Sequence, residues 1–157
     1  MLRTLSVHIP APPHDASAIS AVTMHLGREA LDDPDDRCEH ADCGVRQRRV
    51  KDTEILTWPR LLVVHFKRLG IWNVRTQRPE KDSRHVEFDL FFTPRADVHY
   101  HLHAVIVHGG GSTHGHFIAF FRDSSDRWFR CDDSATPRRV ELGEVLASNA
   151  YMLWYVK

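Results

Sequence analysis

The sequence predicts an α+β fold built mainly from antiparallel β-strands with a few short helices. Short segments with the alternating or apolar pattern of strands recur over the C-terminal two thirds of the chain. Helical periodicity is confined to two short segments, and no repeat or low-complexity tract is present. With 157 residues, of which 42% are hydrophobic, the chain is large enough for one core and too small to suggest two domains.

The N-terminal third alternates between short ordered segments and loops. Residues 4–9 have the pattern of a strand, which an Ala-Pro-Pro sequence ends. Asp15 is placed to cap a helix. Residues 44–56 mix basic and apolar side chains and suit an exposed β-ribbon. The predicted helix presents four apolar side chains on one face: Ala18, Ile19, Val22 and Leu26.

Strands dominate the remainder of the chain. An apolar strand is predicted at residues 61–66, after Pro59. Residues 71–84 have the composition of a polar loop, and residues 142–147 of a short helix before the last strand. Further strands are predicted at residues 85–92, 100–108, 116–122, 127–131 and 150–156.

The charge balance and the cysteine count limit the possible functions. Lys and Arg together number 21, as do Asp and Glu, so the net charge is zero and gives no sign of nucleic-acid or membrane binding. No run of about 18 apolar residues is present to suggest a membrane helix. Three cysteines without a disulfide pattern indicate a reducing compartment, so we expect the protein in the cytoplasm or the nucleus.

Candidate chemistry is concentrated after residue 100. Four of the seven residues from Gly109 to Gly115 are glycine, which lets the backbone approach a ligand closely. His116 follows, at the start of an apolar run, and a histidine held there can act as a general base. Asp132 or Asp133 could orient its second ring nitrogen from the next strand. The alternative is a structural histidine beside an ordinary turn.

These motifs, in this order, resemble the ubiquitin-specific proteases, the papain-like cysteine peptidases that remove ubiquitin. YHLHAVIVHGGGSTHGHFIAFFR, RWFRCDDS and AYMLWYV resemble their histidine box. LTWPRLLVVHFKRLG resembles a strand in the middle of their domain, and TLSVHIP with CEHADC resembles the segment that leads into the second half of their zinc finger. The resemblance implies a partial papain-like fold, formed by the palm and part of the fingers.

The resemblance also implies roles for individual residues. His116 would be the general base and Asp132 its orienting partner, while Asp133 would support the site. His114 competes as a base but does not occupy the motif position. A mobile blocking loop would close over the tail of ubiquitin, and its glycines would be Gly109, Gly110, Gly111 and Gly115.

The nucleophile is the main departure from the family pattern. In the family, the catalytic Cys and the oxyanion donors precede the zinc finger, whereas this sequence resembles the family only from the finger onward. We therefore expect residues 1–157 to form a partial domain without the lobe that carries the nucleophile. Cys131 is not a good substitute, because strand alternation turns it away from the face that Asp132 uses.

The resemblance to the zinc finger covers only half of a metal site. Cys38 and Cys43 are separated by four residues, His40 lies between them as a possible third ligand, and no second Cys pair follows. We expect structural zinc only if a second ligand pair is supplied, and no cofactor for catalysis.

The expected function is thiol-dependent hydrolysis of the bond after the C-terminal glycine of ubiquitin, with His116 and Asp132 supplied by this chain and the nucleophile from elsewhere. The expected partners are ubiquitin or a ubiquitinated protein and an N-terminal protease half. The alternatives are a split enzyme, whose nucleophile arrives on a second polypeptide, and a catalytically inactive ubiquitin-binding or regulatory module.

Overall fold

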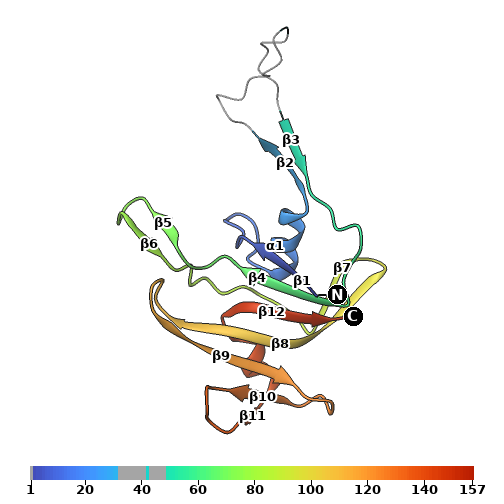
Figure 1. Ribbon diagram of the computed structural model, residues 1–157, viewed down its shortest axis with the longest axis vertical. Helices are drawn as coiled ribbons and strands as arrows, with labels where there is room; N and C mark the ends of the chain where they lie inside the picture. The colour runs from blue at the N-terminus through green and yellow to red at the C-terminus, as the bar shows by residue number, and fades with distance from the viewer. Residues whose placement is uncertain (1, 32–41, 43–48) are drawn as a thin grey trace.

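A mixed eight-stranded sheet forms the body of the protein. The computed structural model describes residues 2–31, 42 and 49–157. Seven strands follow one another in the sheet order β1-β4-β12-β8-β9-β10-β11, and an eighth, β7, pairs with one end of β8 (Figure 1). Their bounds are β1 Leu2–Val7, β4 Leu61–Phe66, β7 Phe91–Arg95, β8 Val98–Gly110, β9 Gly115–Arg122, β10 Trp128–Cys131, β11 Arg138–Val140 and β12 Ala150–Val156.

The sheet is largely antiparallel, as the sequence predicts. Among the described strands, β1 and β4 form the parallel pair, and the other paired strands run antiparallel. Leu61 faces both Leu2 and Val156 in the register, so the first and last strands meet at β4. The N and C labels accordingly lie together in Figure 1.

The core lies on the strands that alternate between buried and exposed positions. In β8, Val98, Tyr100 and Leu102 are buried while the residues between them are exposed. Residue Arg68, which follows β4, is buried as well, and its guanidinium donates hydrogen bonds to the carbonyl oxygens of Ala150 at 2.7 Å and of Asp82 and Arg84 at 2.9 and 2.6 Å. These bonds tie β4 to the start of β12 and to the segment after residue 80.

The first helix, α1 (Ala18–His25), begins with a different cap from the one predicted. The N-cap is Ser17, whose hydroxyl accepts a hydrogen bond from the Ser20 backbone at 3.1 Å, so the prediction of Asp15 is wrong. The buried face is also shifted, since Ala21 is buried and Ile19 is 43% exposed. The helix packs against β1 and β7.

Two small sheets extend from the main one. Strands β2 (Arg28–Leu31) and β3 (Arg49–Asp52) form a ribbon that projects beyond α1, and β3 lies within the predicted ribbon of residues 44–56 (Figure 1). Strands β5 (Ile71–Asn73) and β6 (Arg78–Glu80) form a hairpin where the sequence predicts a polar loop. The Asn73 side chain closes its turn by accepting hydrogen bonds from the backbone of Arg75 and Thr76.

Two other segments differ from the prediction. Residues 85–92 do not form a strand, because only Glu87 makes an isolated bridge and β7 begins at Phe91. The alternating apolar side chains of this segment are nevertheless buried, since Val86 and Phe88 lie in the core although their backbone joins no strand ladder. The short strand β11 was not predicted, and its two arginines hide the strand pattern. The predicted second helix is present as α2 (Leu142–Leu146). In the described part of the chain, no helix is long and apolar enough to cross a bilayer.

Candidate functional site

The glycine-rich segment is mostly the end of a β-hairpin, which corrects the prediction of a loop from Gly109 to Gly115. Gly109 pairs with His116, and Gly110 pairs with Gly115, so only residues 111–114 form the turn. Gly110 has a φ of +97°, a conformation that other residues rarely adopt. At Gly115, a Cβ atom would overlap the His108 ring and the Gly109 carbonyl oxygen. The two strands therefore approach so closely at this point that only glycine fits.

His116 stands on β9 next to this turn and meets Asp132, which directly follows β10. Because Cys131 pairs with Ala119 in an antiparallel ladder, the chain leaves the end of β10 in the direction of His116, near the start of β9. The two side chains form a hydrogen bond of 2.5 Å between Nε2 of His116 and Oδ1 of Asp132. Asp133 is more distant, with Oδ2 3.7 Å from Nδ1 of His116. The sequence-predicted trio is thus brought together, with Asp132 in direct contact.

The local charges favour the protonated form of the histidine. The hydrogen bond to Asp132 and the charge of Asp133 raise the pKa of His116 above its ordinary value of 6.5. In turn, the hydrogen bond to His116 and, beyond it, the guanidinium of Arg130 lower the pKa of Asp132. Half of the His116 side chain is exposed, and 29% of Asp132. The pair therefore combines a basic imidazole that solvent can reach with a carboxylate that stays ionised at neutral pH.

This geometry leaves one ring nitrogen of His116 available for proton transfer. Nε2 is engaged by Asp132, so the neutral imidazole carries its proton there and its lone pair at Nδ1. Asp133 lies beyond hydrogen-bond distance from Nδ1. The arrangement has the features of an oriented general base, in which a carboxylate fixes the tautomer and the opposite nitrogen accepts a proton.

The other base candidate is not oriented in this way. His114 is in the turn, where its ring lies beside Gly111 and its Nδ1 is 3.4 Å from the Thr113 hydroxyl. Cys131 is half-buried on β10, and in the described part of the chain no thiol forms a hydrogen bond with His116. Within the same part, the site trio is the only cluster of three or more His, Cys, Asp or Glu side chains whose ligand atoms lie close together. Cys38 and Cys43 lie outside the described residues, so the half zinc site stays a prediction.

Two residues near the site were missed by the sequence reasoning. Arg130 Nη2 donates a hydrogen bond of 2.6 Å to Oδ2 of Asp132. Lys81, after β6, donates to the carbonyl oxygens of His108 at 2.6 Å and of Gly110 at 3.0 Å, which ties the hairpin of the site to the segment after β6. Arg130 could have been found, because residues two apart on a strand share a face. Lys81 could not, since its partners are backbone atoms.

An aromatic surface continues from the site along the sheet. The ring of Phe117, next to His116, is 4.7 Å from that of His108 and 5.5 Å from that of Tyr151. The ring of His65 on β4 is 4.8 Å from Tyr151. Burial and the nearby Lys81 lower the pKa of His108, so this ring is neutral at neutral pH.

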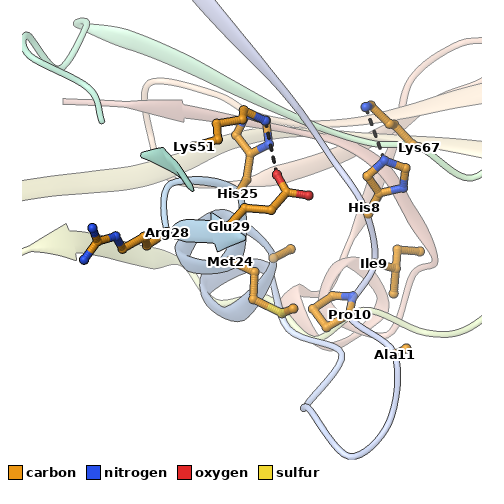
Figure 2. A pocket seen from close by; sticks show the side chains of 12 residues that line it. His8, Ile9, Pro10, Ala11, Met24, His25, Arg28, Glu29, Lys51 and Lys67 are labelled. Carbon is orange, nitrogen blue, oxygen red and sulfur yellow. Dashed lines mark hydrogen bonds and ion pairs between the residues drawn. The ribbon is translucent and has the colours of Figure 1, made fainter. Parts of the chain in front are cut away.

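A separate cavity of about 680 Å³ lies between the end of β1, α1 and the ribbon of β2 and β3, and it contains none of the site trio. In Figure 2, Lys67 is directed toward His8, and Lys51 toward Glu29. Burial, then the charges of Lys51 and Lys67, lower the pKa of His25 on its wall. The polar contacts of this cavity are thus a lysine–histidine pair and a lysine–glutamate pair, which lie apart from the site trio.

Comparison with known sequences identifies the family. The family model described as ubiquitin carboxyl-terminal hydrolase matches residues 19–155. The chain is 31% identical to human ubiquitin carboxyl-terminal hydrolase 2 over 82% of its own length and 22% of that protein. It is 23% identical to the probable ubiquitin carboxyl-terminal hydrolase R319 of Acanthamoeba polyphaga mimivirus, over 98% of this chain and 34% of the relative. The chain thus spans about a third or less of the length of these relatives.

Solved structures that resemble this chain come from the same kind of protein. A SAGA DUB module that contains Ubp8, Sgf11, Sus1 and Sgf73 bound to monoubiquitin matches with a TM-score of 0.78 and 26% identity, over 99% of this chain and 34% of that one. A yeast SAGA DUB module matches with a TM-score of 0.79 and 25% identity, over 99% of this chain and 34% of the matched chain. These likenesses confirm the expected papain-like fold of mainly antiparallel strands. Because the family model covers most of its length, the chain belongs to the ubiquitin carboxyl-terminal hydrolase family.

Proposed function

We propose that this chain provides the general base and its orienting carboxylate for thiol-dependent hydrolysis of the bond after the C-terminal glycine of ubiquitin. The observation that carries the proposal is the 2.5 Å hydrogen bond between His116 Nε2 and Asp132, which leaves Nδ1 to receive the proton of a thiol. In the second half of the reaction, the same nitrogen would activate water. Family membership and the monoubiquitin-bound structural relative support ubiquitin as the substrate.

The nucleophile would come from outside the described residues. In the described part of the chain, no thiol contacts His116. The glycine-rich end of the β8–β9 hairpin would position the tail of ubiquitin beside the His116 imidazole. The expected partners are thus ubiquitin or a ubiquitinated protein, together with a polypeptide segment that carries the thiol. Such a thiol must stay reduced to act as a nucleophile, which supports a cytoplasmic or nuclear location.

Hydrolysis of a fluorogenic ubiquitin amide by the natural polypeptide, captured through its C-terminal segment, tests this proposal. An intact mass well above 18.2 kDa would show that a further segment is covalently attached, which a nucleophile on the same polypeptide requires. His116→Ala is expected to reduce kcat by roughly 10²–10⁴-fold, which is the usual contribution of general-base catalysis. His114→Ala is the matched control, because this histidine has no carboxylate partner among the described residues. Unchanged turnover in His116→Ala would refute the assignment of the base.

A second candidate function is ubiquitin binding without hydrolysis. It is favoured by the same lack of a thiol beside His116 in the described residues. Titration of ubiquitin into the isotope-labelled chain distinguishes the two, when it is compared with ubiquitin that lacks its C-terminal glycines. Shifts at residues 110–116 that require the C-terminal glycines, combined with no turnover by the natural polypeptide, would support the binding module.

A further inference from the structure

Asp132 is held from two sides, and the second side is Arg130. Oδ1 of Asp132 bonds to His116, whereas Oδ2 accepts the hydrogen bond of 2.6 Å from Arg130 Nη2. A carboxylate with one partner can rotate about its terminal bond, but two partners on different oxygens fix its orientation. We propose that Arg130 is a positioning residue that holds Asp132 in the orientation that His116 requires. The inference rests on the proposed function for its catalytic meaning.

The backbone of Asp132 is not itself held by the sheet. Strand β10 ends at Cys131, and the next residues form a turn in which the Ala135 amide donates to the Asp132 carbonyl oxygen at 3.0 Å. Asp133 in this turn has a φ of +46°. The orienting carboxylate therefore stands on the first residue after the strand, where the backbone lacks a ladder.

Arg130, in contrast, is firmly anchored. It lies within β10, pairs with Phe120 on β9 and with Arg138 on β11, and so has a strand on each side. Its side chain is 31% exposed, and its Nη2 reaches the carboxylate of Asp132, two residues further along the chain. The hydrogen bond from Arg130 thus connects the Asp132 carboxylate, which stands in a turn, to a residue that is fixed within the sheet.

The positive charge of Arg130 affects the protonation of both Asp132 and His116. After the His116 hydrogen bond, it contributes to lowering the pKa of Asp132, and it opposes the rise that Asp132 and Asp133 cause in the pKa of His116. An imidazole held too strongly in its protonated form cannot accept a proton at neutral pH. Arg130 therefore keeps the carboxylate ionised and also limits the stabilisation of the imidazolium.

A double-mutant cycle at Arg130 and Asp132, made in the full 157-residue chain, isolates the positioning effect. The quantity measured is the proton affinity of His116, from NMR titration of its imidazole. Arg130→Met alone is not diagnostic, because loss of the positive charge raises this affinity while loss of alignment lowers it. The diagnostic quantity is the effect of Asp132→Asn in each background. With Arg130 present, Asp132→Asn is expected to lower the affinity about tenfold. With Met at position 130, the decrease is expected to be at most half as large on a logarithmic scale.

The matched control is Arg138→Met. Arg138 faces Arg130 in the register, but its guanidinium pairs with Glu144 at 2.7 Å, so the Asp132→Asn effect should remain complete in this background. Arg130→Lys should restore part of the coupling, because an ammonium can also donate to Oδ2. Equal Asp132→Asn effects in the Arg130 and Arg130→Met chains would overturn the proposal.

A second measurement needs no substitution, in case Arg130→Met does not fold. A guanidinium fixed on a carboxylate rotates slowly, so its two Nη nitrogens should give separate NMR signals in the unmodified chain. A single averaged Nη signal for Arg130 would overturn the proposal. The first measurement follows the His116–Asp132 pair and the second the Arg130–Asp132 contact, and neither depends on catalysis. Both therefore stand even if the natural polypeptide proves unable to hydrolyse ubiquitin, which would refute only the proposed function.

Discussion

Substitution of Gly115 by alanine tests the close approach of the two strands that carry the site. A Cβ at this position would lie 2.6 Å from Cε1 of His108 and nearer still to its Nε2 and to the Gly109 carbonyl oxygen. The His108 ring could rotate, but it is buried. The Gly109 oxygen cannot move easily, since it belongs to the paired strand, and Lys81 holds the carbonyls on both sides of it.

The expected cost follows from this crowding. Insertion of one carbon into a well-packed site costs about 1–3 kcal/mol, and a backbone clash places Gly115→Ala at the upper end. For a chain of this size, about 3 kcal/mol corresponds to a fall in Tm of roughly 6–12 °C. The NMR signals of His116, the next residue, should shift with the displaced strand.

Thermal unfolding followed by circular dichroism measures this cost. The matched control is Gly143→Ala in α2, where an added Cβ meets no atom within 4 Å. Alanine is favoured over glycine in a helix by about 1 kcal/mol, so this variant should be slightly more stable than the natural chain. A Gly115→Ala chain with a Tm equal to or above that of the natural chain would refute the reasoning. Adding His108→Ala should recover only part of the loss, because the Gly109 carbonyl remains.

Three further predictions follow from named contacts. The pKa of His116 is raised in the folded chain, so the stability that its contact with Asp132 provides is complete below about pH 6.5 and is lost as the pH rises through the folded-state pKa. The urea midpoints of the natural and Asp132→Asn chains should therefore differ more near about pH 5.5 than near about pH 9. Lys81→Met should weaken the β8–β9 hairpin by about 1 kcal/mol, seen as faster hydrogen exchange of the amides at residues 115–118, whereas unchanged exchange would show that Lys81 does not stabilise it. Arg68→Met leaves three carbonyl oxygens without their donor and should lower the unfolding free energy by about 3 kcal/mol in urea titrations, a loss that a purely surface role would not produce.

Much of the fold can be predicted from local sequence. Residues 61–66 and 150–156 are strands with the predicted bounds, because each combines apolar content with β-branched or aromatic side chains. Residues 85–92 fail for a physical reason: alternation shows which side chains are buried, but not whether a neighbouring strand offers a ladder. The β5–β6 hairpin was missed because its stability comes from polar side chains in the turn rather than from apolar periodicity.

The sequence by itself determined the residue types of the site, since glycines, a histidine and two carboxylates occur there in a family-specific order. The family resemblance also implied Asp132 as the partner of His116, and the two side chains are in contact. Only the tertiary structure decided which ring nitrogen is left free, and that Arg130 and Lys81 hold the surrounding groups. The physical reason is that these features depend on the register between β8, β9 and β10, where a slip of one residue would turn His116 to the other face. Local propensity does not specify that register. The close contact at Gly115 and the cross-strand pairs fix it in the folded sheet.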